Sequence, residues 1–363
     1  MRIQRLFIYP IKSLLPVELA EAEITSTGLK YDRSFILIKD TDRADVEAPS
    51  PAVQEHLTIK TLSKLCLFQP SIRFCNGTTS SAILSVTHTL SGEEIEFPLA
   101  PTSQFLGKAN EYTVKLFGTR AVGEDMGHEI AGWFSKHLGE KARLLYMVGG
   151  STGTRDCPAP ALIPRKSKQR TGFLSWVKVH DEELHAQKIQ FADAAPLLIT
   201  TVSSETDARE RASKNVGGDK DAEEDVIIRF RSNIHIDNVS SRGDDANTNG
   251  DDDDKKRSVP YAEENWKTLK IVPIRLDEDA RNDIGPPVSL DLVFNTVRCM
   301  SLNVDFRTGG TVPLERQLYK LLVKDRRVNP AFPYKPCFGR YAFAEPFGTV
   351  IRVGDQVEVM EWC

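Results

Sequence analysis

The sequence predicts a mixed α+β fold rich in β-strands, in which a barrel or sandwich carries a few peripheral helices. Two observations lead to this class. Short runs of β-branched, aliphatic and aromatic residues recur between Gly, Pro or Asp, and helical periodicity is confined to a few stretches. With 363 residues, of which 40% are hydrophobic, the chain can bury a sizeable core and suits two domains, or one large domain with insertions.

Five stretches fit short strands and two fit helices. The strands are SFILIK (34–39), EIEFPL (94–99), DVIIRFR (225–231), VSLDLVF (288–294) and GTVIRVGDQVEVM (348–360). The helices are predicted within 124–140 and 313–326, where apolar residues repeat at helical spacing. The repeating residues, expected in the core, are Ile130, Trp133, Phe134 and Leu138 in the first helix and Leu314, Leu318, Leu321 and Leu322 in the second.

Composition suggests how the chain is divided. A shift near residue 100 indicates a smaller N-terminal domain over 1–100 and a larger domain over 101–363. Residues 240–258 are rich in Asp, Asn and Gly and cannot bury enough apolar surface to offset the entropy of ordering, so we expect a disordered acidic insertion there. The segment 163–184 starts with a basic run, and is either a variable surface loop or a segment that lines a site entrance or docks an acidic partner.

Charge and cysteine usage exclude several classes. A net charge of −4 gives no overall basic face, and therefore no support for nucleic-acid binding. The six cysteines form no CxxC pair and no secretory signal precedes them, so reduced cysteines in a cytoplasmic monomer are expected. Pro10, Lys12 and Pro16 interrupt the apolar N-terminal run, which is not expected to span a membrane.

Common catalytic signatures are missing, but a set of cations stands out. The sequence contains no GxxxxGK[ST], GxSxG, HExxH or GxGxxG motif. Lys12, Arg33, Arg231 and Arg298 each lie next to a predicted strand end, with Ser13 and Asn233 close by in the sequence. Guanidinium and ammonium groups at these positions could converge on one phosphate or carboxylate. Alternatively, each cation caps a sheet edge or pairs with a surface acid.

Cys299 follows Arg298 at the end of a predicted strand, and three interpretations stay open for it. Free cysteine is usually a small, buried hydrophobic residue. A neighbouring arginine would favour the thiolate, which is a ligand for soft metals and also a nucleophile. Residue types alone do not decide between an inert core residue, a metal ligand and a nucleophile.

The order of seven motifs resembles the MOSC superfamily, and within it the amidoxime-reducing component proteins. The motifs are YPIKSL (9–14), GLKYDRSFIL (28–37), FADAAPLLITT (191–201), FRSNIHIDN (230–238), YAEENW (261–266), RCMSLNVDFRTG (298–309) and CFGRYAFAEPFGTVIRVGD (337–355). Each is weak alone, but together they cover nearly the whole chain. The resemblance implies a MOSC β-barrel domain with a smaller, barrel-like MOSC N-terminal domain.

The resemblance also implies a molybdenum cofactor, molybdopterin, with molybdenum bound by a single cysteine, here Cys299. Asp193 would lie near the metal and accept or relay a proton. Ala194 and Ala195 stand where relatives often have small hydroxyl residues, so any side-chain hydrogen bonds from such hydroxyls to the cofactor would be missing here. The implied cofactor contacts are Lys12, Ser13, Arg33, Asp193, Ala194, Ala195, Arg231, Asn233, Arg298 and Cys299.

The reaction implied by the resemblance is a two-electron reduction of N-hydroxylated compounds of the amidoxime or hydroxylamine type, with nitrite as a further acceptor. Electrons would come from a cytochrome b5 type haem protein and its NADH-dependent reductase. The alternative is a carrier of molybdenum cofactor or of persulfide sulfur that has no reductase activity; a degenerate scaffold is a third interpretation. Cytosol is the expected location, with mitochondrial association as the alternative that the relatives suggest.

Overall fold

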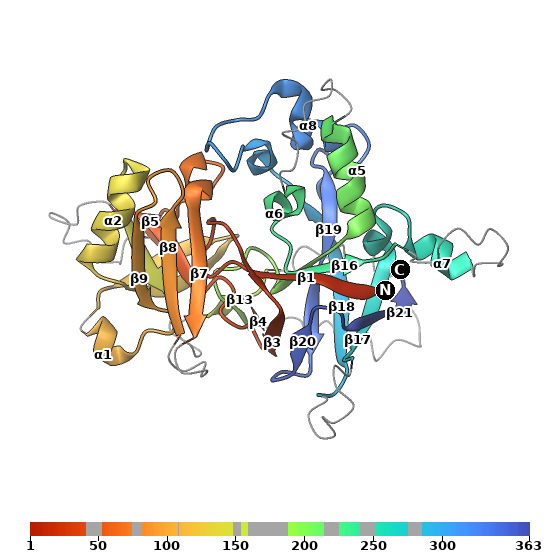
Figure 1. The fold of residues 1–363 in the computed structure, drawn as a ribbon, viewed down its shortest axis with the longest axis horizontal. Helices are drawn as coiled ribbons and strands as arrows, with labels where there is room; N and C mark the ends of the chain where they lie inside the picture. The colour runs from red at the N-terminus through yellow and green to blue at the C-terminus, as the bar shows by residue number, and fades with distance from the viewer. Residues whose placement is uncertain are drawn as a thin grey trace, which may run out of the picture.

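A computed structural model describes residues 1–40, 53–74, 82–107, 109–147, 154–158, 188–213, 225–239, 252–274 and 285–363. These residues form two β-rich units that lie side by side, with the N-terminal unit on the left and the larger barrel on the right of Figure 1. The β-rich α+β class predicted above is confirmed. No helix in these ranges is both long and apolar enough to cross a membrane.

The larger unit is a closed barrel of seven strands. In spatial order they are β16 (Ile234–Asp237), β15 (Leu197–Thr201), β19 (Cys337–Glu345), β18 (Val288–Val297), β17 (Trp266–Val272), β21 (Gln356–Trp362) and β1 (Arg2–Ile8). The barrel closes because β1 also pairs with β16, and β2 (Val17–Leu19) extends the sheet beside β1. Alternate residues such as Leu6, Ile199 and Leu290 fill the interior. The first strand of the chain therefore completes a barrel made otherwise from its second half.

The N-terminal unit combines two smaller sheets and a covering helix. One sheet has the order β5 (Phe35–Lys39), β12 (Ala142–Tyr146), β11 (Thr119–Asp125), β10 (Glu111–Leu116) and β6 (Val53–Gln54); the other has the order β7 (Phe68–Phe74), β8 (Ala82–His88) and β9 (Glu94–Pro98). Phe68 and Phe134 belong to the shared core under helix α2 (His128–Leu138). The division at residue 100 stays a prediction, but strands from both sides of that residue share the first sheet.

Small elements connect and cover these sheets. They are the strands β3 (Glu21–Thr25), β4 (Gly28–Leu29), β13 (Arg155–Asp156), β14 (Lys188–Ile189) and β20 (Val350–Arg352), the α-helices α1 (Ser103–Leu106), α5 (Val202–Ser213), α6 (Val226–Phe230), α7 (Asp252–Arg257) and α8 (Leu318–Val323), and the 3-10 turns η1 (Ser63–Leu67), η4 (Ala262–Asn265), η5 (Met300–Asn303) and η6 (Leu314–Arg316). Helices α5, α6 and α8 lie together at one end of the barrel (Figure 1).

Most predicted elements are confirmed, and two are corrected. The predicted strand 225–231 is wrong, because Val226–Phe230 forms helix α6, which ends where Arg231 adopts a left-handed conformation. The predicted helix 313–326 is split into η6 and α8, and this split leaves Leu314 62% exposed, whereas Leu318 and Leu322 are buried. The break lies at Gln317, whose φ of −69° and ψ of 95° are extended rather than helical, so the backbone leaves the helical conformation between η6 and α8.

The predicted disordered insertion is only partly described. Residues 240–251 lie outside the described residues, but Asp252–Arg257 form α7, in which Lys255, Lys256 and Arg257 occupy the last turn. The helix dipole favours cations at the C-terminal end of a helix. The prediction of disorder rested on overall composition, which does not include this effect of residue order. The segment 163–184 lies wholly outside the described residues.

Candidate functional site

The two N-terminal motifs lie against each other where the chain passes from the barrel to the N-terminal unit. The amide of Arg33 donates to the carbonyl of Tyr9 at 2.8 Å, and the amide of Lys12 donates to the carbonyl of Phe35 at 2.8 Å. Because β1 ends at Ile8 and β5 starts at Phe35, these bonds hold both motifs at the junction of the two units.

Three of the predicted cofactor contacts have an unusual backbone conformation. Ser13, Arg33 and Arg231 have φ angles of 74°, 54° and 57°, and they make up half of the six non-glycine residues with positive φ in the described ranges. A left-handed conformation costs a non-glycine residue about 1 kcal/mol or more, and such residues cluster at binding and catalytic sites. Backbone strain is therefore found at three residues of the predicted cofactor-binding motifs.

Two of these strained residues stack on one aromatic ring. The guanidinium carbons of Arg33 and Arg231 lie 4.9 and 4.2 Å from the ring centre of Tyr9. Arg33 also forms a buried ion pair with Asp32. Stacking on the ring fixes the planes of both guanidinium groups while leaving their edges able to bond elsewhere.

Asn233 holds this arrangement together from the barrel side. Its side-chain nitrogen donates to Asp32 at 3.1 Å and to the carbonyl of Phe7 at 3.2 Å, and its oxygen accepts from the amide of Leu198 at 3.1 Å and from Arg33 at 3.4 Å. The amide group thus uses both donors and both acceptor positions inside the protein. Asn233 therefore belongs to the site as a residue that orients Arg33 and Asp32, because its side-chain donors and acceptor are already used within the protein.

Lys12 and Asp193 form an ion pair between the two halves of the chain. Burial lowers the pKa of Lys12 to about 8, although Asp193 partly opposes this effect. Desolvation would raise the pKa of Asp193, but Lys12, Arg33 and Arg231 outweigh it and hold that pKa well below the usual range of a carboxyl. The Asp193 side chain keeps 45% exposure, so an ionised carboxylate faces an open space beside buried cations.

The cluster carries more positive than negative charge. Arg231 donates through Nη1 to the carbonyl of Leu14 at 2.9 Å, whereas its buried Nη2 has no hydrogen-bond partner among the described residues. Burial lowers the pKa of Arg231 to about 10, which still leaves it charged at neutral pH. Among the described residues, the carboxylates that act on Lys12, Arg33, Arg155 and Arg231 are Asp32 and Asp193, so four cations face two carboxylates.

Arg298 and Cys299 differ sharply although they are neighbours. The Arg298 guanidinium is buried and donates to the carbonyls of Phe338 at 3.0 Å and Phe230 at 2.8 Å, so it braces α6 against β19. Cys299 is exposed, and its sulfur lies 3.0 Å from the Ser301 hydroxyl. The interpretation of Cys299 as an inert core residue is therefore wrong; the metal-ligand and nucleophile interpretations stay predictions.

Three residues that sequence reasoning missed also belong to this cluster. Tyr341 on β19 has a pKa raised by burial and also by the negative charges of Asp193 and Cys299, which brings both residues within electrostatic reach of one phenol. Burial and the charges of Lys12 and Arg155 lower the pKa of His56 to about 4. Arg155 is the third. No local motif marks any of them, because the fold alone brings them together.

The loop around Asp193 completes the cluster. Ala194 and Ala195 are buried, and the carbonyl of Ala194 accepts a hydrogen bond from the Cys157 thiol at 3.0 Å.

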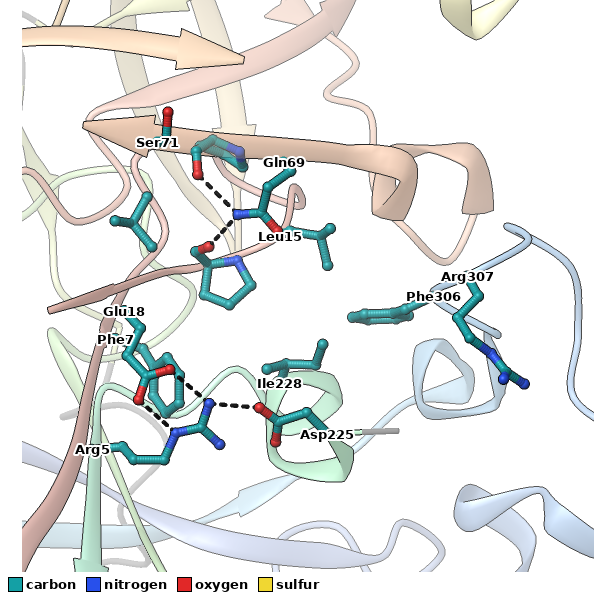
Figure 2. A pocket seen from close by; sticks show the side chains of 13 residues that line it. Arg5, Phe7, Leu15, Glu18, Gln69, Ser71, Asp225, Ile228, Phe306 and Arg307 are labelled. Atoms are coloured by element: carbon teal, nitrogen blue, oxygen red, sulfur yellow. Dashed lines mark hydrogen bonds and ion pairs between the residues drawn. The ribbon is translucent and has the colours of Figure 1, made fainter. Parts of the chain in front are cut away.

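A cleft of about 710 Å³ opens between the two units next to these segments (Figure 2). None of the predicted site residues lines it, but its walls continue the segments that carry them: Leu15–Glu18 follow Ser13, Ile228 precedes Arg231, and Phe306 and Arg307 follow Cys299. At its floor, Arg5 is neutralised by Glu18 and Asp225, as the dashed lines of Figure 2 show. The volume suits a small organic molecule, and the remaining walls are largely apolar.

Comparison with known proteins identifies the two units. Residues 1–141 match the MOSC N-terminal beta barrel domain, and residues 186–358 match the MOSC domain. Mitochondrial amidoxime-reducing component 1 of Mus musculus is 24% identical over 369 residues, which cover 99% of this chain and 82% of that protein. The same protein of Homo sapiens is 24% identical over 368 residues, with the same coverage of both chains.

A second kind of relative matches a shorter stretch. Molybdenum cofactor sulfurase of Danio rerio is 25% identical over 275 residues, which are 74% of this chain but only 26% of that protein. This chain thus spans about a quarter of the sulfurase and most of the amidoxime-reducing component proteins. With both domain models matched in order over nearly the whole chain, the protein belongs to the MOSC superfamily and consists of a MOSC N-terminal beta barrel domain followed by a MOSC domain.

Proposed function

We propose that this protein binds a molybdenum-bearing pterin cofactor at the cation cluster and reduces N-hydroxylated compounds. The observation that carries the proposal is the excess of buried positive charge, including the unpartnered Nη2 of Arg231. A buried donor without a partner costs about 1–3 kcal/mol, and more when it is charged. An anionic group from outside the chain would remove this cost.

The residues present fit a phosphate-bearing pterin. Lys12, Ser13, Arg33 and Arg231 would hold the phosphate and the pterin, and the exposed sulfur of Cys299 would be the soft ligand for molybdenum. Asp193 and Cys299 both contribute to the raised pKa of Tyr341, which supports placing the two residues in one site. When bound, the metal supplies the two-electron chemistry, and the protein supplies binding, orientation and charge.

The reaction consumes two electrons and two protons, and converts an N–OH group into N–H plus water. Asp193 stays ionised at neutral pH, so its role is to accept hydrogen bonds and orient a neighbour. Lys12, whose pKa lies at about 8, holds the proton nearest to that carboxylate and can exchange it with water at neutral pH. This assigns proton delivery to Lys12 and water, with Asp193 as their orienting group.

The proposed donor is a haem protein of the cytochrome b5 type, reduced by an NADH-dependent reductase. The full-length likeness to the amidoxime-reducing component proteins supports this choice, and their name suggests a mitochondrial association as the alternative to the cytosol. The cleft in Figure 2 offers a route by which a small apolar substrate reaches the junction of the units. A monomer is proposed.

The test is to purify the chain from a host that makes molybdopterin, and to measure molybdenum, pterin and reduction of an aryl amidoxime by a reduced cytochrome b5 type protein. Cys299→Ser is expected to keep the fold but lose molybdenum and activity together. Cys363→Ser is the matched control, because Cys363 is another exposed cysteine that lies at the end of the chain. Retention of molybdenum in Cys299→Ser, or absence of molybdenum from a folded and cofactor-supplied wild type, would contradict the proposal.

A second candidate function is a carrier of the cofactor or of persulfide sulfur. The sulfurase match over 74% of the chain favours it, since Cys299 would then accept sulfur. Incubation with a cysteine desulfurase and cysteine should in that case add one sulfur atom to Cys299, seen by intact-mass analysis, with no amidoxime reduction. Turnover without sulfur addition would support the reductase.

A further inference from the structure

Arg155, on β13, is among the most deeply buried charged residues of the described chain, with 2% exposure. All five of its N–H donors have acceptors, as a guanidinium allows. The acceptors are the carbonyls of Gln190 (3.2 Å from Nε), of Ala192 and Asp193 (the latter 2.7 Å from Nη2) and of Leu116 (3.3 Å from Nη1), and the hydroxyl of Thr119 (2.7 Å from Nη1).

These acceptors belong to two separate parts of the molecule. Gln190, Ala192 and Asp193 form the loop that enters the barrel at β15, whereas Leu116 and Thr119 lie at the turn between β10 and β11 of the N-terminal unit. One side chain therefore joins the Asp193 loop to the other unit. Two residues further on, Cys157 continues the series by donating to the carbonyl of Ala194.

The arrangement is energetically unusual, because in the part of the chain that the structure describes no carboxylate bonds directly to this buried charge. Burial lowers the pKa of Arg155 to about 10, and the first charge that opposes this effect is that of Asp193. Taking an unpaired charge out of water is costly. A lysine would keep the charge, but could not span acceptors on both sides of a planar fork.

We infer that Arg155 is a positioning residue that clamps the loop 190–194 against the β10–β11 turn and so presents the Asp193 carboxylate to Lys12. Arg155 lies between the two regions that match the domain models, 1–141 and 186–358. The inference deepens the proposed function, since it concerns the Asp193 side of the same site. It concerns the protein's own geometry, however, and is testable without cofactor.

The test is an NMR titration of the Lys12 side chain in the full chain, assigned by comparison with Lys12→Arg. The charged groups that act on Lys12 are Asp193, which raises its pKa, and Arg33 and Arg155, which lower it. In Arg155→Lys the positive charge is retained while the fork is lost, so Asp193 is expected to move away from Lys12. The pKa of Lys12 should then fall from about 8 by about half a unit or more.

Arg143→Lys is the matched control. Arg143 is also a buried arginine, but it pairs with Asp40 and Asp125 inside the N-terminal unit, away from the Asp193 loop. The control should leave the Lys12 titration unchanged. Hydrogen exchange of the amides of 188–194 should accelerate in Arg155→Lys alone.

Thr119→Val provides a milder variant if Arg155→Lys does not fold. It removes a single acceptor of the Arg155 fork, and should lower the Lys12 pKa in the same direction by a smaller amount. An unchanged Lys12 titration in the folded variants would overturn the inference. Because the titration uses chain without cofactor, a failed reductase assay leaves this result unaffected, and the two proposals can fail separately.

Discussion

Two of the buried polar clusters in the described part of the chain handle their excess charge differently. One is the cation cluster at the junction of the units, formed by Lys12, Arg33, Arg155 and Arg231 with Asp32 and Asp193. The other is an acid cluster beneath α5, formed by Glu263 and Glu264 with Thr201, Ser204 and Arg326. Both contain polar atoms without a hydrogen-bond partner among the described residues, for example Nη2 of Arg231 and Oε1 of Glu263.

The clusters differ in how that charge can be removed. Burial, together with the neighbouring Glu264, raises the pKa of Glu263 to about 7, so this carboxylate can take a proton from water near neutral pH. Arg231 cannot lose its proton under those conditions, even with a pKa near 10. Protonation can therefore neutralise Glu263 near neutral pH, whereas loss of the Lys12 proton would still leave the cation cluster with an excess of positive charge that an anion from outside can pair. This difference supports the proposed role of the cation cluster as a binding site.

The largest effect on stability is expected from Arg326→Met in the acid cluster. Arg326 forms an ion pair with the buried carboxylate of Glu264 and stacks 3.6 Å from the ring centre of Tyr261. Removing one partner leaves a buried charge uncompensated, which costs about 3–5 kcal/mol. Urea unfolding should show a loss of this size, whereas Arg73→Met, in an exposed pair with Glu96, should change stability by less than about 0.5 kcal/mol. A loss of unfolding free energy below about 1 kcal/mol for Arg326→Met would contradict the expected difference between the buried and the exposed ion pair.

The next largest effect is a pH dependence that comes from Glu263. Its pKa is about 7 in the folded protein and close to the ordinary glutamate value of 4.5 in the unfolded protein, so the folded state binds more protons between these values. Unfolding free energy should therefore fall as pH rises from about 4.5 to about 7, by an amount on the order of 3 kcal/mol from this group. Glu263→Gln should flatten that part of the stability profile. An equally steep profile in the variant would assign the pH dependence to other groups.

Much of the site could be predicted from the sequence because its key residues sit in local motifs. Lys12, Arg33 and Arg231 stand out as cations next to predicted strand ends and Asp193 through the family resemblance, and the structure brings these four residues into one cluster. The β-rich class followed from short strand patterns. The error at 225–231 has a local cause, since a run of apolar residues of strand length does not distinguish a strand from a buried single-turn helix.

The residues that were missed depend on tertiary pairing. Arg155 reaches the Asp193 loop because β13 pairs with β14, and His56 reaches Lys12 through a bridge to Ile38 of β5. Tyr341 is one aromatic residue of a strand and looks like a core residue. Arg298 stays a predicted cofactor contact, although its guanidinium donates to the carbonyls of Phe338 and Phe230, a use of its donors that sequence spacing does not reveal.

The smallest effect on stability is expected where the effect on binding is largest, at Arg231. Arg231→Met removes one hydrogen bond to Leu14 and a contact with Tyr9, but it also removes a buried, incompletely paired charge, so the apo protein should change by only about 1 kcal/mol in either direction. Molybdenum and pterin per chain should fall at least about tenfold, which corresponds to about 1.4 kcal/mol of lost binding free energy. Activity per bound molybdenum should stay close to that of the wild type.

Arg298→Met is the matched control, because Arg298 is a buried arginine whose donors bind the carbonyls of Phe338 and Phe230. Losing those bonds leaves buried acceptors unsatisfied, at about 1–3 kcal/mol each. The Arg298 variant should thus lose stability in the absence of cofactor, while the Arg231 variant loses cofactor without losing stability. If Arg231→Met proves the more destabilising of the two, its guanidinium is a structural brace, and the cation cluster would have to be reinterpreted as a network of the same kind as the acid cluster.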